Sequence, residues 1–149
     1  MTPSTTPHVD VQVVRRYQVS PDRLFAAWLD PVIVGRWMFG PEVRDEEVIR
    51  IAIDARPEGL FSFVVRRQGE EIDHVGRYLE LERPRRLVFT WMVRGESSVG
   101  SCVVVEIDPL ETGAVLTLRH ELPLDWADFA DRTEAGWMKM LDALDRTLG

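Results

Sequence analysis

The sequence is poor in cysteine and in basic charge. Its 149 residues include one cysteine, Cys102, and one lysine, Lys139, while 25 carboxylates against 18 basic side chains give a net charge of −7. One cysteine cannot form an intramolecular disulfide or a paired-cysteine zinc site, and it fits a reducing compartment. Because the arginines are scattered among acids, the composition argues against nucleic acid and anionic membrane surfaces as partners.

Long hydrophobic runs are missing as well. No window approaches about 18 consecutive apolar residues, and residues 1–8 hold two prolines and three threonines without a basic or an apolar segment. We therefore expect neither a membrane-spanning helix nor a secretory signal, and we expect the cytoplasm as the compartment. Residues 1–8 are predicted to form a disordered tail. Residues 9–149 are enough for one well-packed domain and too few for two.

A strand and two helix starts are predicted next. Residues 9–19 alternate between apolar and polar side chains, as a strand does. Ser20-Pro21 and Asp30-Pro31 each place a capping residue before a proline suited to the first helical position. Two short helices are therefore expected, and Gly40-Pro41 should end the second. The apolar side chains of this second helix are Val32, Ile33 and Trp37.

From residue 48 to residue 122 the hydrophobic period is two. Six strands are predicted, over residues 48–54, 60–67, 72–82, 86–94, 101–108 and 114–122. The turns between them are too short to hold crossover helices, so the strands should pair in antiparallel fashion.

The last segment, residues 128–148, has the spacing of an amphipathic helix. Trp137, Leu141, Leu144 and Leu148 recur at i, i+4, i+7 and i+11, and Met140 lies beside this stripe. Such a helix is roughly 30 Å long, which is the width of a small domain. The predicted fold is therefore α+β, with one long helix packed across a curved, mostly antiparallel sheet of six to seven strands.

Several segments resemble one known family. Residues 15–31, followed by Arg36-Trp37 and Gly40-Pro41, resemble the opening of the Hsp90-ATPase-activator-homologue-1-like (AHSA1-like) branch of the START-like, helix-grip superfamily, also called SRPBCC. Residues 76–91 are similar to the middle of that family, and residues 116–120 to its last strand. Gly136-Trp137, followed by Leu141 and Leu144, is similar to its closing helix. The resemblance implies a single-domain protein with the helix-grip, Bet v 1-like fold. Separately, 17 of the 18 basic side chains are arginine, and this skew suggests a GC-rich genome, as in many bacteria.

Catalytic motifs are not evident. His8, His74 and His120 share no metal-ligand spacing, so no metal site and no cofactor are predicted. The serines near residues 97–101 lack a nucleophile-elbow context, and Cys102 lies among apolar residues, as an unreactive thiol would. His120 has the inward parity of its strand. It either faces a ligand or is satisfied by a neighbouring carboxylate or by the backbone, and both interpretations stay open.

Aromatic side chains are the strongest functional signal. Five tryptophans are many for one small domain, and Trp37, Trp91 and Trp137 lie on three separate elements. They either fill the core or line a pocket, and the resemblance to a superfamily that commonly holds apolar ligands favours a pocket. Arg77 could pair with an anionic head group if it faces inward, or lie at the sheet edge. The predicted lining is Trp37, Phe61, Phe63, Arg77, Trp91, His120, Trp137, Leu141, with Met138 nearby.

The residue patterns and the resemblance together leave three functions open. The first is a protein that binds a small hydrophobic ligand between sheet and helix, with no residue assigned to catalysis. The second is a cyclase/aromatase-like enzyme in which His120 and Arg77 would act on a hydrophobic substrate. The third, an Hsp90 co-chaperone, is disfavoured because the resemblance covers a single domain. A homodimer through a sheet edge or through Trp126 and Phe129 stays open.

Overall fold

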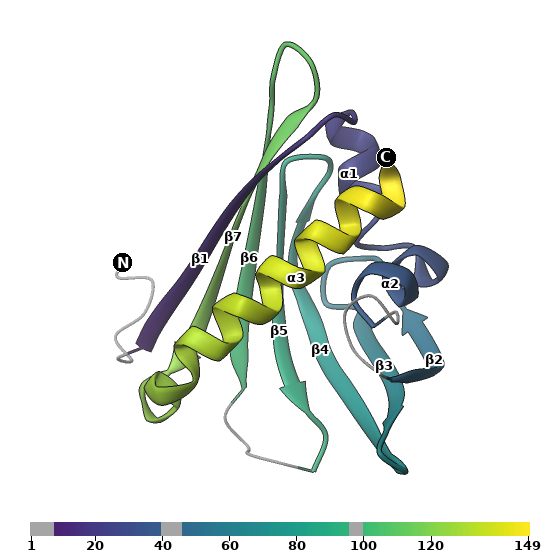
Figure 1. The fold of residues 1–149 in the computed structure, drawn as a ribbon, viewed down its shortest axis with the longest axis vertical. Helices are drawn as coiled ribbons and strands as arrows, with labels where there is room; N and C mark the ends of the chain where they lie inside the picture. Colours follow the sequence, from purple (N-terminus) through teal and green to yellow (C-terminus); the bar gives the residue numbers. More distant parts are fainter. Residues whose placement is uncertain (1–7, 40–45, 96–99) are drawn as a thin grey trace.

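A computed structural model describes residues 8–39, 46–95 and 100–149 of the chain (Figure 1). The expectations at Gly40-Pro41 and Ser97-Ser98 lie outside these residues. The strands are β1 (His8–Tyr17), β2 (Glu47–Ile53), β3 (Leu60–Arg67), β4 (Glu70–Glu82), β5 (Arg86–Val93), β6 (Ser101–Pro109) and β7 (Ala114–Pro123). The helices are α1 (Pro21–Ala26), α2 (Pro31–Trp37), the short 3₁₀ helix η1 (Leu124–Phe129) and α3 (Ala130–Leu148).

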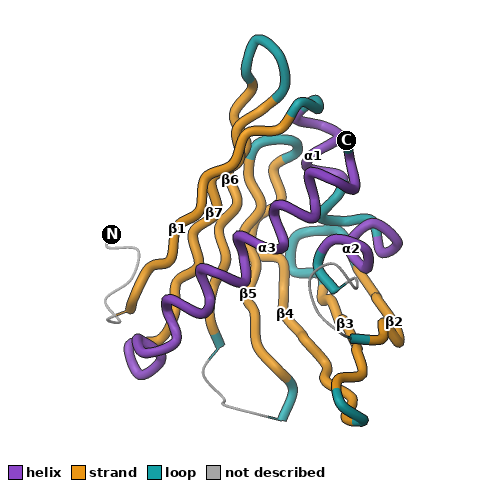
Figure 2. The backbone as a smooth tube through the Cα atoms, in the orientation of Figure 1, coloured by secondary structure: helices purple, strands orange, loops and turns teal. Residues whose placement is uncertain are grey.

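The seven strands form one curved, antiparallel sheet in the order β1-β7-β6-β5-β4-β3-β2. β1 and β2 are consecutive strands but lie at opposite edges, and α1 and α2 occupy the connection between them (Figure 2). This confirms the predicted α+β helix-grip fold. β1 begins at His8, the last residue of the predicted tail.

Both predicted helix caps are present. The side chain of Ser20 accepts a hydrogen bond from the Arg23 amide at 3.2 Å, and that of Asp30 accepts one from the Val32 amide at 2.9 Å. The apolar face of α2 differs from the prediction, because Val32 is 64% exposed whereas Val34 and Trp37 are buried. A seven-residue helix presents only one narrow side to the sheet, and Val34 and Trp37 share that side at i and i+3.

The long helix α3 crosses one face of the sheet, which we call the inner face (Figure 1). Its buried residues include the predicted stripe of Trp137, Leu141, Leu144 and Leu148. Met138 does not join the interior, since it is 40% exposed.

Three contacts fix α3 to β1 and α1. The Tyr17 hydroxyl donates to the Leu141 carbonyl at 2.9 Å, Arg23 donates to the Leu148 carbonyl at 2.7 Å, and Arg15 pairs with Asp142 at 3.1 Å. Burial raises the pKa of Tyr17, and nearby Asp145 raises it further, so this phenol stays a hydrogen-bond donor at neutral pH. The helix is thus held both by its apolar stripe and by defined polar contacts.

Gly76 lets an aromatic ring lie directly on β4. It is opposite Phe61 in the β3–β4 ladder, and a Cβ at this position would lie 2.4 Å from the Phe61 ring and 2.0 Å from the Thr90 carbonyl oxygen. Phe61 in turn contacts the rings of Phe63, Tyr78, Phe89 and Trp91. The missing side chain therefore makes room for the centre of the aromatic core.

We expect Gly76→Ala to lower the free energy of unfolding by about 2 kcal/mol, because the added methyl group displaces both a packed ring and a strand carbonyl. Gly100→Ala is the control: its nearest atom would be 3.6 Å away, so its effect should stay within about 0.5 kcal/mol. Urea denaturation measures the free energy of unfolding of both variants. Equal stability of the two variants would show that Phe61 does not lie over β4.

Candidate functional site

A pocket of about 430 Å³ lies between the inner face, η1 and the first turns of α3. Its floor consists of residues from five different elements: His74, Trp91, Ser101, His120 and Trp137. Its mouth consists of half-buried or exposed side chains, namely Arg67, Trp126, Phe129, Arg132 and Thr133. The remaining lining is mostly apolar, as in small-molecule sites.

A chain of hydrogen bonds crosses the floor of the pocket. The indole Nε1 of Trp137 is 3.0 Å from Nδ1 of His120, and Nε2 of His120 is 2.7 Å from Oγ of Ser101. Ser101 Oγ donates to the Trp91 carbonyl at 2.9 Å. The three side chains are at most 5% exposed. The chain therefore runs through the interior from α3 to β5.

The direction of this chain determines the tautomer of His120. An indole N–H can only donate, so Nδ1 of His120 must be the acceptor and carry no proton. In the neutral ring the proton then lies on Nε2, which donates to Ser101. Burial lowers the pKa of His120 from 6.5 to about 4, so the ring is neutral at physiological pH.

This arrangement does not activate Ser101 as a nucleophile. A general base needs a free lone pair facing the hydroxyl, whereas Nε2 of His120 points its proton at Ser101 and its lone pair on Nδ1 is taken by Trp137. Of the two interpretations left open for His120, the structure supports the satisfied histidine. Its partners are Trp137 and Ser101 instead of a carboxylate or the backbone.

Aromatic rings form a continuous surface around this chain. The ring centroids of Trp91 lie 5.3 Å from His74 and 6.4 Å from Trp137, and those of His120 and Trp137 are 6.0 Å apart. Nδ1 of His74 lies 3.2 Å from the Phe63 carbonyl, which can only accept, so this nitrogen carries a proton. The floor thus offers flat apolar surface to a ligand.

The structure brings together three of the predicted lining residues: Trp91, His120 and Trp137. Four others, Trp37, Phe61, Phe63 and Leu141, are at most 3% exposed and pack in the core beside the pocket. The indole N–H of Trp37 donates to the Ala27 carbonyl at 3.0 Å. These four residues support the pocket without lining it.

The expectation that Arg77 faces the interior is wrong. Its side chain is 55% exposed on the outer face of the sheet, where it pairs with Glu58 at 3.5 Å. A β-bulge between Tyr78 and Glu80 explains the error. Arg77 and Leu81 are both odd-numbered, and Leu81 packs against the core. The extra residue at the bulge lies between them, so odd-numbered residues face outward before the bulge and inward after it.

Several site residues were missed in the sequence. Ser101 shares the parity of the buried residues Val103 and Val105, so its inward direction was readable, but a lone serine gives no signal of its partner. Trp126, Phe129 and Arg132 were not assigned to the site because η1 reverses the chain there in a way that no local pattern indicates.

A second, larger hollow of about 800 Å³ lies on the outer face over β2 to β5. Leu60, Val75, Leu79 and Met92 contribute to its lining. Its charged residues are already engaged: Arg77 pairs with Glu58, Arg94 with Asp73 and Asp54 with Arg56. Since it offers no buried polar group to orient a ligand, we take the smaller inner pocket as the candidate site.

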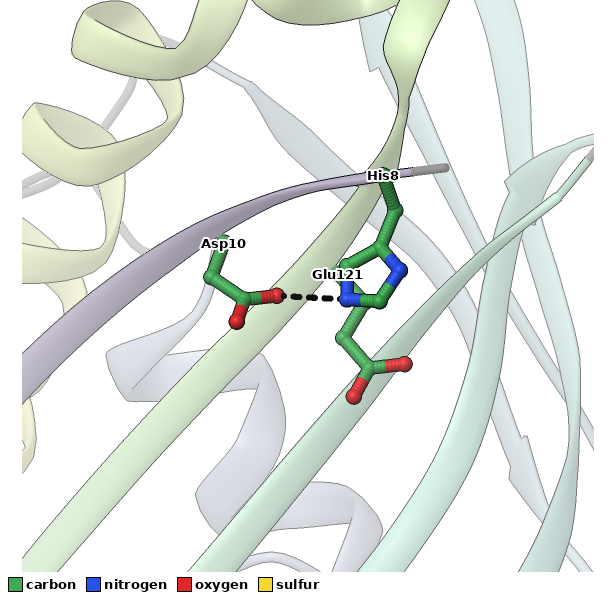
Figure 3. Close-up of side chains that lie close together, drawn as sticks. All are labelled: His8, Asp10 and Glu121. Carbon is green, nitrogen blue, oxygen red and sulfur yellow. Dashed lines mark ion pairs between the residues drawn. The ribbon is translucent and has the colours of Figure 1, made fainter. Parts of the chain in front are cut away.

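One group of metal-ligating side chains comes together among the described residues, away from the pocket (Figure 3). His8, Asp10 and Glu121 have ligand atoms within 4.8 Å of one another. His8 lies 3.1 Å from Asp10, and Arg119 occupies a carboxylate oxygen of Glu121 at 3.1 Å. The group is solvated and Arg119 supplies a competing cation, so we assign no metal site to it.

Cys102 lies half-buried on the outer face, in the ladder between Thr90 and Glu121. Burial raises the pKa of its thiol to about 11, and the Glu121 carboxylate contributes to the rise. The thiolate is therefore scarce at neutral pH, in agreement with the predicted unreactive thiol. No helix among the described residues is long and apolar enough to cross a membrane.

The sequence matches the model of a family described as Activator of Hsp90 ATPase homolog 1-like protein over residues 18–149. Among curated proteins no match is found. A solved protein of Chromobacterium violaceum is 24% identical, with a TM-score of 0.78 over 92% of this chain and 94% of that one. An AHSA1-like protein of Aeromonas hydrophila is 19% identical, with a TM-score of 0.78 over 94% of this chain and 92% of that one. A Staphylococcus aureus protein of unknown function is 18% identical, with a TM-score of 0.80 over 96% of this chain and 94% of that one. These likenesses are of fold.

Proposed function

The chain belongs to the family of Activator of Hsp90 ATPase homolog 1-like proteins, and from this membership and the inner pocket we propose that it binds a small hydrophobic molecule between its sheet and α3. The observation that carries the proposal is the pocket floor, where rings from β4, β5, β7 and α3 surround a chain of hydrogen bonds that joins Trp137, His120 and Ser101. A floor of this kind favours an apolar occupant.

The hydrogen-bond chain is what makes the buried floor suitable for apolar surface. Polar groups buried without partners cost free energy, and a hydrophobic ligand could not supply partners for them. Here Trp137, His120 and Ser101 satisfy one another, so an apolar body can cover them without that cost. The volume of about 430 Å³ falls toward the low end of typical small-molecule pockets, which span roughly 300–1,000 Å³.

A pocket-filling substitution tests this function. Val93 lines the pocket on β5, so Val93→Trp should occupy the space and weaken binding of the neutral fluorescent probe N-phenyl-1-naphthylamine at least about tenfold. Val14→Trp is the matched control, since Val14 is 47% exposed on the outer face of β1. Fluorescence titration measures affinity, and unfolding curves confirm that both variants fold. Unchanged affinity in folded Val93→Trp would contradict the proposed site.

The enzymatic alternative loses its pair of polar groups, because His120 lies in the inner pocket and Arg77 on the outer face. Three expectations remain predictions: that the protein does not bind Hsp90, that a homodimer is possible, and that the protein lies in the cytoplasm. Native mass spectrometry of the purified protein addresses the ligand and the oligomeric state together, because it reports both the mass of the assembly and any bound molecule.

A further inference from the structure

The charged side chains that line the inner pocket among the described residues are all positive. The chain as a whole carries a net charge of −7, yet among the described residues the charged side chains that line the pocket are Arg67 and Arg132, and no carboxylate lines it. Both arginines lie toward the mouth, and the floor contains the neutral His120. The pocket is therefore apolar at depth and cationic at its entrance.

The two arginines differ in how their charge is balanced. Arg67 forms a close ion pair with Glu46, whose side chain is 1% exposed, so the carboxylate offsets the charge of Arg67. The guanidinium of Arg132 lies 5.7 Å from the centroid of the Phe129 ring, and among the described residues no carboxylate lies within ion-pair distance of it. Among the described residues, Arg132 is thus the cation at the mouth that has no ion-pair partner.

From this geometry we propose that the ligand is an amphiphilic anion: its apolar body lies on Trp91 and Trp137, and its anionic group faces Arg132 at the mouth. The proposal rests on the proposed function and adds the polarity and orientation of the ligand. Within the floor, Trp137, His120 and Ser101 already bond to one another and offer no positive charge to an anionic group, and an uncompensated buried charge is costly. Arg132 instead offers a planar set of donors suited to carboxylate or sulfonate groups.

Two probes that share one apolar body separate the two parts of this proposal. N-Phenyl-1-naphthylamine is neutral, and 1-anilinonaphthalene-8-sulfonate adds one anionic group to the same rings. We expect Arg132→Gln, which removes the charge and keeps a polar side chain, to weaken binding of the sulfonate about tenfold and to leave the neutral probe within about twofold. Lys139→Gln is the matched control, since it removes the same charge from an exposed position of α3 outside the pocket.

Each result of these titrations supports or contradicts a specific part of the proposal. A selective loss of sulfonate binding in Arg132→Gln, absent in Lys139→Gln, supports the assignment. Equal losses for both probes would show that Arg132 acts by packing, and equal losses in both variants would show a general charge effect; either result overturns the head-group assignment and leaves hydrophobic binding intact. If the wild-type protein binds neither probe, or if Val93→Trp binds both as well as wild type does, the proposed function itself fails.

Discussion

Trp137→Ala should lower the free energy of unfolding by about 4 kcal/mol, the largest loss of stability that we expect from a single substitution in this protein's pocket. Trp137 is 2% exposed, and its ring centroid lies about 6 Å from those of Trp28, Trp91 and His120. Alanine removes these contacts, leaves a cavity beneath α3, and deprives Nδ1 of His120 of its donor. Urea denaturation followed by circular dichroism measures the loss.

Trp137→Phe separates ring packing from the hydrogen bond. It retains an aromatic ring but leaves Nδ1 of His120 without a donor, so we expect a smaller loss of about 1–3 kcal/mol and a rise in the pKa of His120. Trp126→Phe is the control, because Trp126 is half-buried at the pocket mouth and its change should cost less. If Trp137→Phe is as stable as wild type, the chain through His120 makes no contribution to stability.

Acidification should destabilise the wild-type protein through His120 by about 3 kcal/mol between pH 7 and pH 4. Burial lowers the pKa of this ring from 6.5 to about 4 in the folded protein. Between these two values the unfolded chain binds a proton that the folded chain does not. The stability due to neutral His120 is therefore fully present above pH 6.5 and is lost as the pH falls toward 4.

His120→Gln isolates this effect from the carboxylates that titrate in the same range. A glutamine amide can still accept from Trp137 and donate to Ser101, but it does not titrate. We expect the variant to lose about 3 kcal/mol less stability than wild type over the same pH interval. In the wild-type protein, the NMR signal of the His120 ring should stay that of the neutral form down to about pH 5. A midpoint near 6.5 would contradict the buried chain.

The fold was predictable because its signals are local. The caps at Ser20 and Asp30, the period of two from residue 48 onward and the stripe from Trp137 to Leu148 each depend on neighbours within a few residues. Backbone geometry makes such patterns visible without knowledge of the partner element. The prediction of which β4 side chains face inward was wrong, because the bulge in β4 depends on its pairing with β5 and is not visible in the local sequence.

The antiparallel sheet, the closing helix and the inward direction of Trp91, His120 and Trp137 follow from the periodicity of the residues along the chain. The roles of these side chains depend on long-range packing, because Ser101, His120 and Trp137 come from three elements that meet only in the folded protein. That meeting sets the tautomer of His120, and burial at the same place keeps its ring neutral. The fold also brings Arg132 to the same pocket. Periodicity reports which face a residue occupies, whereas hydrogen bonding and burial depend on atoms that are distant in the chain.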